Sequence, residues 1–409
     1  MTDTRRSFLT GVAATGLGLS VANTATARET QRYLVTGAEG NVGRRLEREG
    51  FVVDAALEDA NVFVVTGPAG ETDAIRGVSG VQAATVDYVI DYEEPADGAT
   101  SVESDDVTGQ QWDKELIDAF EAHDHATGAD TRLAVIDTGI DYAHPDLAPN
   151  LNTDLSRMYL DGEVGEDGDD VHLHGTHVAG IAAGSGDNGL YGVAPEAELV
   201  SLRIYGPDVS QSNTSDVFRA LDYAAEIGAD AVNMSIGRGP RPPQDNAHAS
   251  RDAYRVAQER VIRSVVRRGT SVVVAAGNED TNLQHGGKFH QWSSLTGTLG
   301  VSATTEDDER ASFSNYGTNT IDVGAPGANV YSAIPLDYEF EPPYAFLSGT
   351  SMASPQVAGL ACLVRELEPE SNPEQVERAI KRGAELADGD SHPDFGAGRI
   401  NALQTAESI

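Results

Sequence analysis

The alternation of strand-like and helix-like segments from Gln111 to the C-terminus is the feature that most limits the fold of this chain. Short apolar runs, such as residues 132–136, are repeatedly followed by longer helical patterns. Parallel strands need long crossover connections, and helices usually supply them. The alternation therefore predicts one large α/β domain with a mainly parallel central sheet.

A smaller unit precedes this domain. Residues 31–90 read in order as strand, helix, strand, strand, helix and strand, which predicts a compact βαββαβ module. The stretch that follows, EEPADGATSVESDDVTGQ (residues 93–110), is acidic and contains Gly, Ser and Pro. This composition predicts an exposed linker.

The first 27 residues have the pattern of an export signal. Arg5 and Arg6 stand in a charged head, residues 11–22 form an apolar run too short to span a bilayer, and residues 25–27 fit a small-residue cleavage site. The Arg pair, followed by Ser-Phe-Leu, is typical of the twin-arginine route, with a chance Arg pair as the alternative. We expect a secreted protein that has no membrane segment after signal removal.

The charge of the chain excludes some partners. It has 65 Asp and Glu against 28 Lys and Arg, a net charge of −37, so nucleic acids and anionic membranes would be repelled. Only three of the basic residues are lysines, at positions 114, 288 and 381. This composition predicts a salt-adapted surface, because molar salt shortens the Debye length to about 3 Å. An acidic protein from an ordinary habitat is the alternative.

Two other features suggest chemistry that we do not expect. The single cysteine, Cys362, excludes an internal disulfide and lies in an apolar helical stretch, so it is predicted to be a buried structural thiol. Glycines at 37, 40 and 43 follow a strand as in dinucleotide-binding motifs. The module is too short for the two halves of such a domain, so we interpret these glycines as a turn and a helix start.

Three segments of the large domain each place a reactive side chain at the end of a predicted element. Asp137 ends a strand, His174 opens a helix rich in Gly and Ala, and Ser351 begins a helix after a Gly-Thr turn. Taken singly, a turn-capping Asp, a structural His and an N-cap Ser are the simpler interpretations. Together, and in this chain order, they predict a serine nucleophile with a His base and an orienting Asp.

Three histidines within six residues also suggest zinc. His172, His174 and His177 are close in sequence, but there is no HExxH pattern and no Glu between His174 and His177. We therefore expect His177 to be structural and His172 to lie at the surface.

On the blocks IDTGID, HGTHVAG and GTSMASP, residues 111–405 resemble the subtilisin family of serine proteases, and the acidic composition is most similar to the halolysins of haloarchaea. The resemblance implies a three-layer α/β fold and a catalytic triad of Asp137, His174 and Ser351. It also implies peptide-bond hydrolysis without a cofactor by a monomeric enzyme.

The same resemblance implies further site residues. Asn278, in VVVAAGNED, would supply the oxyanion amide, and Ser235-Ile236-Gly237 would pair with an extended polypeptide substrate. Glu279 would lie near the base of the primary specificity pocket and favour a basic or polar side chain there.

It also implies a domain organisation. Residues 1–27 would be the signal peptide, 28–105 a propeptide with its acidic linker, and 106–409 the catalytic domain. The propeptide would assist folding and place its last strand and tail in the active site, with the cut between residues 92 and 110.

Structural calcium is the one metal that the resemblance implies. Asp146 would be a ligand, although the companion loop at 184–195 is shorter than usual for the family, and the acidic loop at 161–170 is a second candidate with a solvated loop as its alternative. For the chain as a whole, the alternatives are a non-cleaving peptide binder of the same fold and an NAD-dependent enzyme.

Overall fold

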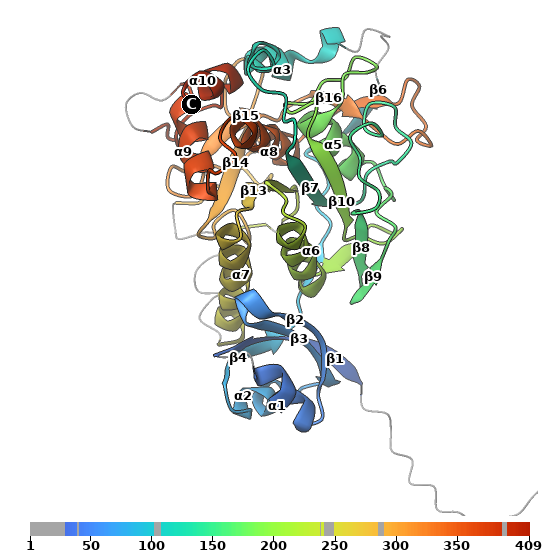
Figure 1. Cartoon of the computed structure of the whole chain (residues 1–409), viewed down its shortest axis with the longest axis vertical. Coiled ribbons are helices and arrows are strands. Elements are labelled where there is room, and N and C mark those ends of the chain that lie inside the picture. Colours follow the sequence, from blue (N-terminus) through green and yellow to red (C-terminus); the bar gives the residue numbers. More distant parts are fainter. Residues whose placement is uncertain are drawn as a thin grey trace, which may run out of the picture.

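The computed structural model describes residues 29–38, 41–101, 108–237, 239–240, 249–284, 290–386 and 391–409. The predicted signal peptide and twin-arginine motif lie outside these residues, as does Gly40. The described chain forms a small amino-terminal domain and a large domain above it (Figure 1).

The amino-terminal domain has the predicted βαββαβ order. Its elements are β1 (Thr30–Gly37), α1 (Val42–Arg48), β2 (Val52–Leu57), the short 3-10 helix η1 (Glu58–Ala60), β3 (Val62–Pro68), α2 (Thr72–Gly77) and β4 (Val81–Val86). The strands lie in the order β2-β3-β1-β4, and each neighbouring pair is antiparallel. A dinucleotide-binding domain needs parallel strands, so this pairing excludes the NAD interpretation. Gly37 instead allows close packing, because a Cβ there would lie 2.9 Å from Val42.

Both faces of this small sheet are covered, by different partners. Tyr33 and Val35 of β1 pack with Leu46 of α1 in the domain's own core. Leu34, which points to the opposite face, belongs to the same core as Phe218 in the large domain. The amino-terminal domain thus rests on helices α6 (Thr214–Glu226) and α7 (Ala249–Arg267) of the large domain (Figure 1).

The large domain is built on an eight-stranded sheet, in the order β15-β14-β13-β12-β7-β10-β8-β9. All neighbouring strands are parallel except β8 and β9. These strands are β7 (Arg132–Asp137), β8 (Arg157–Leu160), β9 (Glu163–Gly165), β10 (Glu198–Arg203), β12 (Ala231–Met234), β13 (Ser271–Ala275), β14 (Thr298–Thr304) and β15 (Val323–Pro326). The prediction of a mainly parallel sheet is confirmed.

Helices cover both faces of the sheet and make the fold three-layered. The helices are α3 (Trp112–Leu116), α4 (Ala119–Ala122), α5 (His174–Ala183), α6 (Thr214–Glu226), α7 (Ala249–Arg267), α8 (Thr350–Leu367), α9 (Pro373–Gly383) and α10 (Ala402–Glu407), with a 3-10 turn η2 at Thr108–Gln110. Leu133 and Val135 of β7 share a core with α5 and α8, whereas Ala134 and Ile136 share the other core with α6 and α7. Cys362 of α8 is buried in the first of these cores, and burial raises the pKa of its thiol to about 12.

The segment between the domains differs from the sequence-based expectation. The predicted strand at 82–90 is broken, because β4 ends at Val86 and a separate β5 (Val89–Asp91) pairs antiparallel with β11 (Gln211–Asn213) of the large domain. Between them, the Asp87 carboxylate accepts hydrogen bonds from Ser215. We call residues 89–101 the cleft segment.

The predicted exposed linker is also partly ordered. Its residues Asp97–Ser101 form β6, which pairs antiparallel with β17 (Tyr344–Ser348), itself paired with β16 (Val330–Ala333). These residues are exposed except for Ala99, as expected, but they are ordered as a strand because β17 offers backbone groups for the segment to pair with. In the described part of the chain, no helix has the length and apolar character needed to cross a membrane.

Candidate active site

Asp137 and His174 meet at the carboxyl end of the parallel sheet. Asp137 is the last residue of β7 and His174 the first of α5. Nδ1 of His174 lies 2.7 Å from Oδ1 of Asp137, and both side chains are buried. The same oxygen accepts the backbone N–H of Thr138 at 2.8 Å. The end of β7 and the start of α5 therefore fix the position of the Asp137 carboxylate relative to the His174 imidazole.

The environment of His174 suits a general base. Burial opposes its charged form, but the charge and hydrogen bond of Asp137, with the carboxylates of Asp170 and Glu93, together outweigh burial, so the pKa of His174 is raised. With Nδ1 donating to Asp137, Nε2 is the acceptor, and this nitrogen is buried without a partner among the described residues. It can take a proton from a hydroxyl group.

Ser351 lies in the first turn of α8, which begins at Thr350. Ser235, just after β12, holds this turn, because its hydroxyl donates to the backbone carbonyl of Ser351 at 2.9 Å and lies 2.9 Å from Oγ of Ser354. Asn233 in turn donates to Oγ of Ser235. The Ser235 side chain therefore positions the helix start.

Asn278 places an amide group beside the same turn. Its Oδ1 accepts the backbone N–H of Thr350 at 2.9 Å and the Thr350 hydroxyl at 3.1 Å, which orients Nδ2. A Cβ built on Gly349 would lie 3.6 Å from Nδ2 of Asn278 and equally far from the backbone nitrogen of Ser351. The two nitrogen atoms therefore lie near one another at the start of α8, where the pair could serve as the two donors that stabilisation of an oxyanion requires.

The cleft segment passes over these groups. The register of β5 and β11 pairs Ile90 with Ser212, and the backbone N–H of Tyr92 donates to the carbonyl of Ser210 at 3.0 Å. The ring of Tyr92 stands edge-on to that of His174, with centroids 5.8 Å apart. An extended polypeptide therefore already lies across the candidate catalytic histidine.

Ser235-Ile236-Gly237 lies on the other side of this segment. Ile236 and Ile90 are buried in the same core. A Cβ on Gly237 would lie 3.1 Å from Oε2 of Glu93, so Gly237 leaves room for that side chain. Glu279 is exposed, and its Oε2 accepts from Asn315 at 2.5 Å.

His172 and His177 differ in their surroundings. Nε2 of His177 lies 3.0 Å from the carbonyl oxygen of Ala345, and burial lowers its pKa to about 3, which fits a neutral structural residue. His172, expected at the surface, is half-buried instead because Tyr92 covers it, with ring centroids 5.3 Å apart.

The surroundings of Asp146 bear on the predicted calcium ion. One carboxylate oxygen accepts the backbone N–H of Asn188 at 2.8 Å and the other the hydroxyl of Tyr344 at 2.6 Å. Across the described ranges, no group of three or more acidic, His or Cys residues could hold a metal. Calcium also takes backbone and amide oxygens as ligands, so Asp146 as a calcium ligand stays a prediction.

Sequence reasoning missed two residues near the site. Thr350 fixes Asn278, and its place directly before Ser351 was the available signal. His290, fully buried, brings Nε2 to 2.5 Å from the position of a Cβ on Gly237. No local pattern marks His290, because only the fold brings it there.

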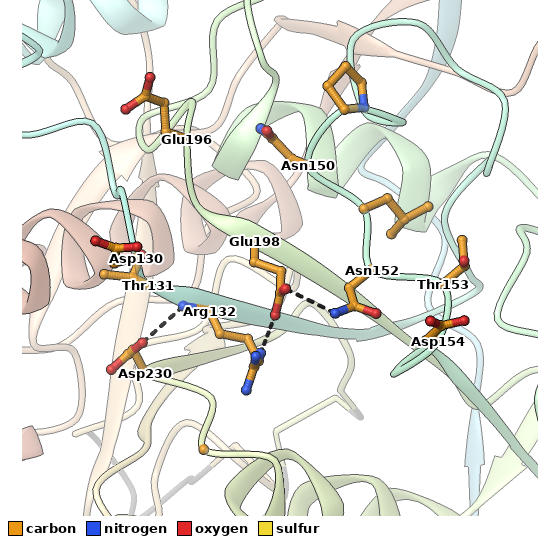
Figure 2. A pocket seen from close by; sticks show the side chains of 13 residues that line it. Asp130, Thr131, Arg132, Asn150, Asn152, Thr153, Asp154, Glu196, Glu198 and Asp230 are labelled. Atoms are coloured by element: carbon orange, nitrogen blue, oxygen red, sulfur yellow. Dashed lines mark hydrogen bonds and ion pairs between the residues drawn. The ribbon is translucent and has the colours of Figure 1, made fainter.

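A large hollow of about 690 Å³ lies elsewhere, at the amino ends of β7 and β10 (Figure 2). Arg132 pairs there with Glu198, and its backbone N–H donates to Asp230 at 2.9 Å. Ligand sites of parallel sheets lie at the carboxyl ends of the strands, so this acidic hollow is not the candidate active site.

Known proteins share both sequence and fold with this chain. The M-protease of Shouchella clausii (strain KSM-K16) is 34% identical over 325 residues, which are 79% of this chain and 75% of that protein. Subtilisin Savinase of Lederbergia lenta is 35% identical over 71% of this chain and 96% of its own. The thermophilic serine proteinase of Bacillus sp. (strain AK1) is 36% identical over 66% of this chain, and the match spans only 60% of that protein.

The fold comparison agrees. The crystal structure of the epidermin leader peptide processing serine protease from Staphylococcus aureus superposes with a TM-score of 0.77 at 20% identity, over 93% of this chain and 98% of that one. The model of the Subtilase family matches residues 128–398. The chain therefore belongs to the subtilase family of serine peptidases.

Proposed function

We propose that this chain is the precursor of a secreted, self-processing serine endopeptidase that hydrolyses polypeptides through Asp137, His174 and Ser351. The observation that carries the proposal is the cleft segment, an extended stretch of the chain's own backbone that pairs with β11 and β17 while Tyr92 covers His174. The cleft thus accepts polypeptide by backbone pairing, which tolerates many sequences.

The proposed mechanism uses only side chains and backbone groups. Oγ of Ser351 attacks the substrate carbonyl while Nε2 of His174 takes its proton, and Asp137 holds the imidazole and stabilises its charged form. Nδ2 of Asn278 and the backbone N–H of Ser351 meet the oxyanion. His174 then protonates the leaving amine, and water releases the acyl group by the same steps. No cofactor is needed.

Three further parts of the proposal concern the precursor. Residues 1–27 direct export by the twin-arginine route, residues 28–105 are the propeptide and linker, and residues 106–409 the catalytic domain, which acts as a monomer. The fit of the amino-terminal sheet against α6 and α7, with Leu34 in a shared core, supports an inhibitory and folding role for the propeptide.

The fourth part is adaptation to high salt, in a protein of the halolysin kind. Among the described residues, the side chain of the partly exposed Asp87 is buried, and five acidic residues are buried as a whole, all of them aspartates: Asp113, Asp137, Asp141, Asp146 and Asp216. Nearly all the other described carboxylates therefore contact solvent, where salt screens their mutual repulsion.

The test is hydrolysis of casein by protein purified in molar salt, with and without a serine-directed irreversible inhibitor. We expect the inhibitor to abolish cleavage and Ser351→Ala to remain a full-length, inactive precursor in a host without other proteases. Cleavage by the Ser351→Ala protein would reject the triad, and a mature-sized product from it would reject self-processing. Activity unchanged by a chelator is expected if no metal takes part.

A further inference from the structure

Glu93 occupies the space that the specificity pocket should offer to a substrate. Its carboxyl group accepts a hydrogen bond from the backbone N–H of Asn278, and its Oε2 lies 3.1 Å from the position of a Cβ on Gly237. The next residue, Glu94, is exposed. The segment therefore directs the first of these side chains into the pocket and the second into solvent.

Contacts of the cleft segment before and after Glu93 and Glu94 limit which of its peptide bonds can lie at Ser351. Upstream, Tyr92 is bonded to Ser210 and packs on His174. Downstream, the backbone N–H of Ala96 donates at 2.7 Å to the carbonyl of Ser348, three residues before Ser351. Four peptide bonds lie between Tyr92 and Ala96. In the Glu93–Glu94 bond, the residue on the carbonyl side, Glu93, has its side chain held beside Asn278. The bond after Glu94 joins an outward-facing residue to a proline nitrogen.

His290 presents an unused hydrogen-bond donor to this pocket. Its Nδ1 accepts the backbone N–H of Ser293 at 3.3 Å, so in the neutral ring Nε2 carries the proton. Burial lowers the pKa of His290 to about 4, which keeps the ring neutral near pH 7. Nε2 is fully buried, has no partner among the described residues, and lies 2.5 Å from the same Cβ position on Gly237.

We propose, building on the function proposed above, that the chain matures by cleaving the Glu93–Glu94 bond and that His290 makes its specificity pocket selective for a glutamate side chain. The N–H of Asn278 already binds the Glu93 carboxyl group, and the Nε2–H of His290, which has no partner in the part of the chain that the structure describes, becomes the second donor when a glutamate side chain turns toward it. Because an unmade bond to a buried donor is costly, apolar side chains in the pocket leave His290 unsatisfied.

The cleavage step balances without an added oxidant or cofactor. The Ser351 oxygen forms an ester with the Glu93 carbonyl carbon, the bond from that carbon to the Glu94 nitrogen breaks, and the serine proton passes through His174 to the Glu94 amine. Water then attacks the ester, gives a proton through His174 back to Ser351, and leaves a new carboxylate on Glu93.

The charges around the pocket favour the protonated form of this glutamate. Burial and then the carboxylate of Glu279 raise the pKa of Glu93 to about 7, while the Asn278 N–H and His174 act in the opposite direction. Burial also raises the pKa of Glu279. A protonated carboxyl can share its proton with Glu279, whereas two ionised carboxylates would repel each other. The pocket therefore suits glutamate near or below neutral pH.

The first experiment locates the bond in the full-length chain. After maturation in molar salt, N-terminal sequencing and intact mass of the large product should give Glu94 as the first residue. Glu93→Lys should slow maturation about tenfold or more, the cost of leaving one buried donor without an acceptor, while Glu93→Gln, which keeps an acceptor oxygen, and the exposed control Glu94→Gln should slow it much less. A first cut at another bond, or rapid maturation of Glu93→Lys at this one, would overturn the assignment.

The second experiment tests His290 on the mature enzyme with anilides of sequence Ile-Asp-Tyr-Xaa, where Xaa is Glu, Gln, Leu or Lys. We expect kcat/KM to be highest for Glu and Gln. His290→Leu should lower the Glu-to-Leu ratio about tenfold, and His290→Gln, which keeps a donor, should largely restore it. A merely structural His290 would lower all four rates together and leave the ratio unchanged, which would overturn its role.

Casein hydrolysis distinguishes a failure of the pocket assignment from a failure of the endopeptidase function. If casein is cleaved while the first maturation cut falls at another bond, the pocket assignment alone fails. The same holds if casein is cleaved while the Leu and Lys anilides have the same kcat/KM as the Glu anilide. If the wild-type protein cleaves neither casein nor itself, the endopeptidase function fails and the pocket assignment with it.

Discussion

Oδ1 of Asp137 lies 2.7 Å from Nδ1 of His174, and this carboxylate holds the pKa of the imidazole above its ordinary value although the ring is buried. The proposed base accepts a proton only in its neutral form, so kcat/KM should rise with pH as His174 loses its proton. Asp137→Asn should lower kcat by about 10⁴-fold and move the limb to lower pH, because the charge that favours imidazolium is gone. A pH–rate profile of both proteins checks this. The prediction is contradicted if kcat/KM of Asp137→Asn rises over the same pH range as that of the wild type.

Asn278 allows the oxyanion role to be separated from a structural one. Its Oδ1 binds Thr350, while Nδ2 faces the point shared with the Ser351 backbone nitrogen. Asn278→Asp keeps an acceptor for Thr350 and loses the donor, so kcat should fall about 10²- to 10³-fold with little change in thermal stability. Asn278→Ala should lose similar activity and also some stability. Equal kcat in Asn278→Asp and wild type would remove Asn278 from the mechanism.

The sequence anticipated the elements that local patterns describe. Asp137, His174 and Ser351 were predicted as site residues because each ends an apolar strand or lies at the start of a helix, and strand and helix ends of a parallel sheet meet at one edge. The βαββαβ order followed from periodicity in the same way. These predictions needed no knowledge of long-range contacts.

Contacts between distant segments could not be predicted in this way. His290 and Glu93 lie near one another only because the fold brings both side chains against Gly237, which follows β12. The linker pairs as β6 because β17 offers an edge, which its own acidic, turn-rich composition does not reveal. The pocket's selectivity thus depends on tertiary packing, and the residue types alone favoured a basic side chain beside Glu279.

Salt dependence follows from where the charge lies. Because few of the acidic residues that the structure describes are buried, the excess negative charge is mostly at the surface. Raising KCl toward about 1 M should raise the thermal midpoint of the Ser351→Ala precursor, because the Debye length shrinks from about 10 Å at 0.1 M to about 3 Å. Differential scanning calorimetry measures this, and a midpoint independent of salt would contradict the salt adaptation while leaving the peptidase function intact.

Asp87 should make release of the cleaved amino-terminal domain depend on pH. Its carboxylate accepts from the Ser215 N–H at 3.0 Å and hydroxyl at 2.5 Å and lies 3.5 Å from Arg32. Burial outweighs these bonds and the Arg32 charge, and together with the nearby Asp216 carboxylate it leaves the pKa of Asp87 raised from 3.8 to about 6. The docked state therefore prefers the proton. Docking should be tightest at low pH, weaken as pH rises from 3.8 toward about 6, and stay constant above that.

The measurement is the dissociation rate of the two fragments after maturation, followed by size-exclusion chromatography across this pH range. Asp87→Asn, which keeps an acceptor for Ser215 but carries no titrating proton, should flatten the dependence and dissociate at all pH values about as slowly as the protonated wild type. Arg32→Gln is the matched control, because losing its charge should raise the pKa of Asp87 further and move the pH dependence upward. If Asp87→Asn keeps the full pH dependence, another group controls release.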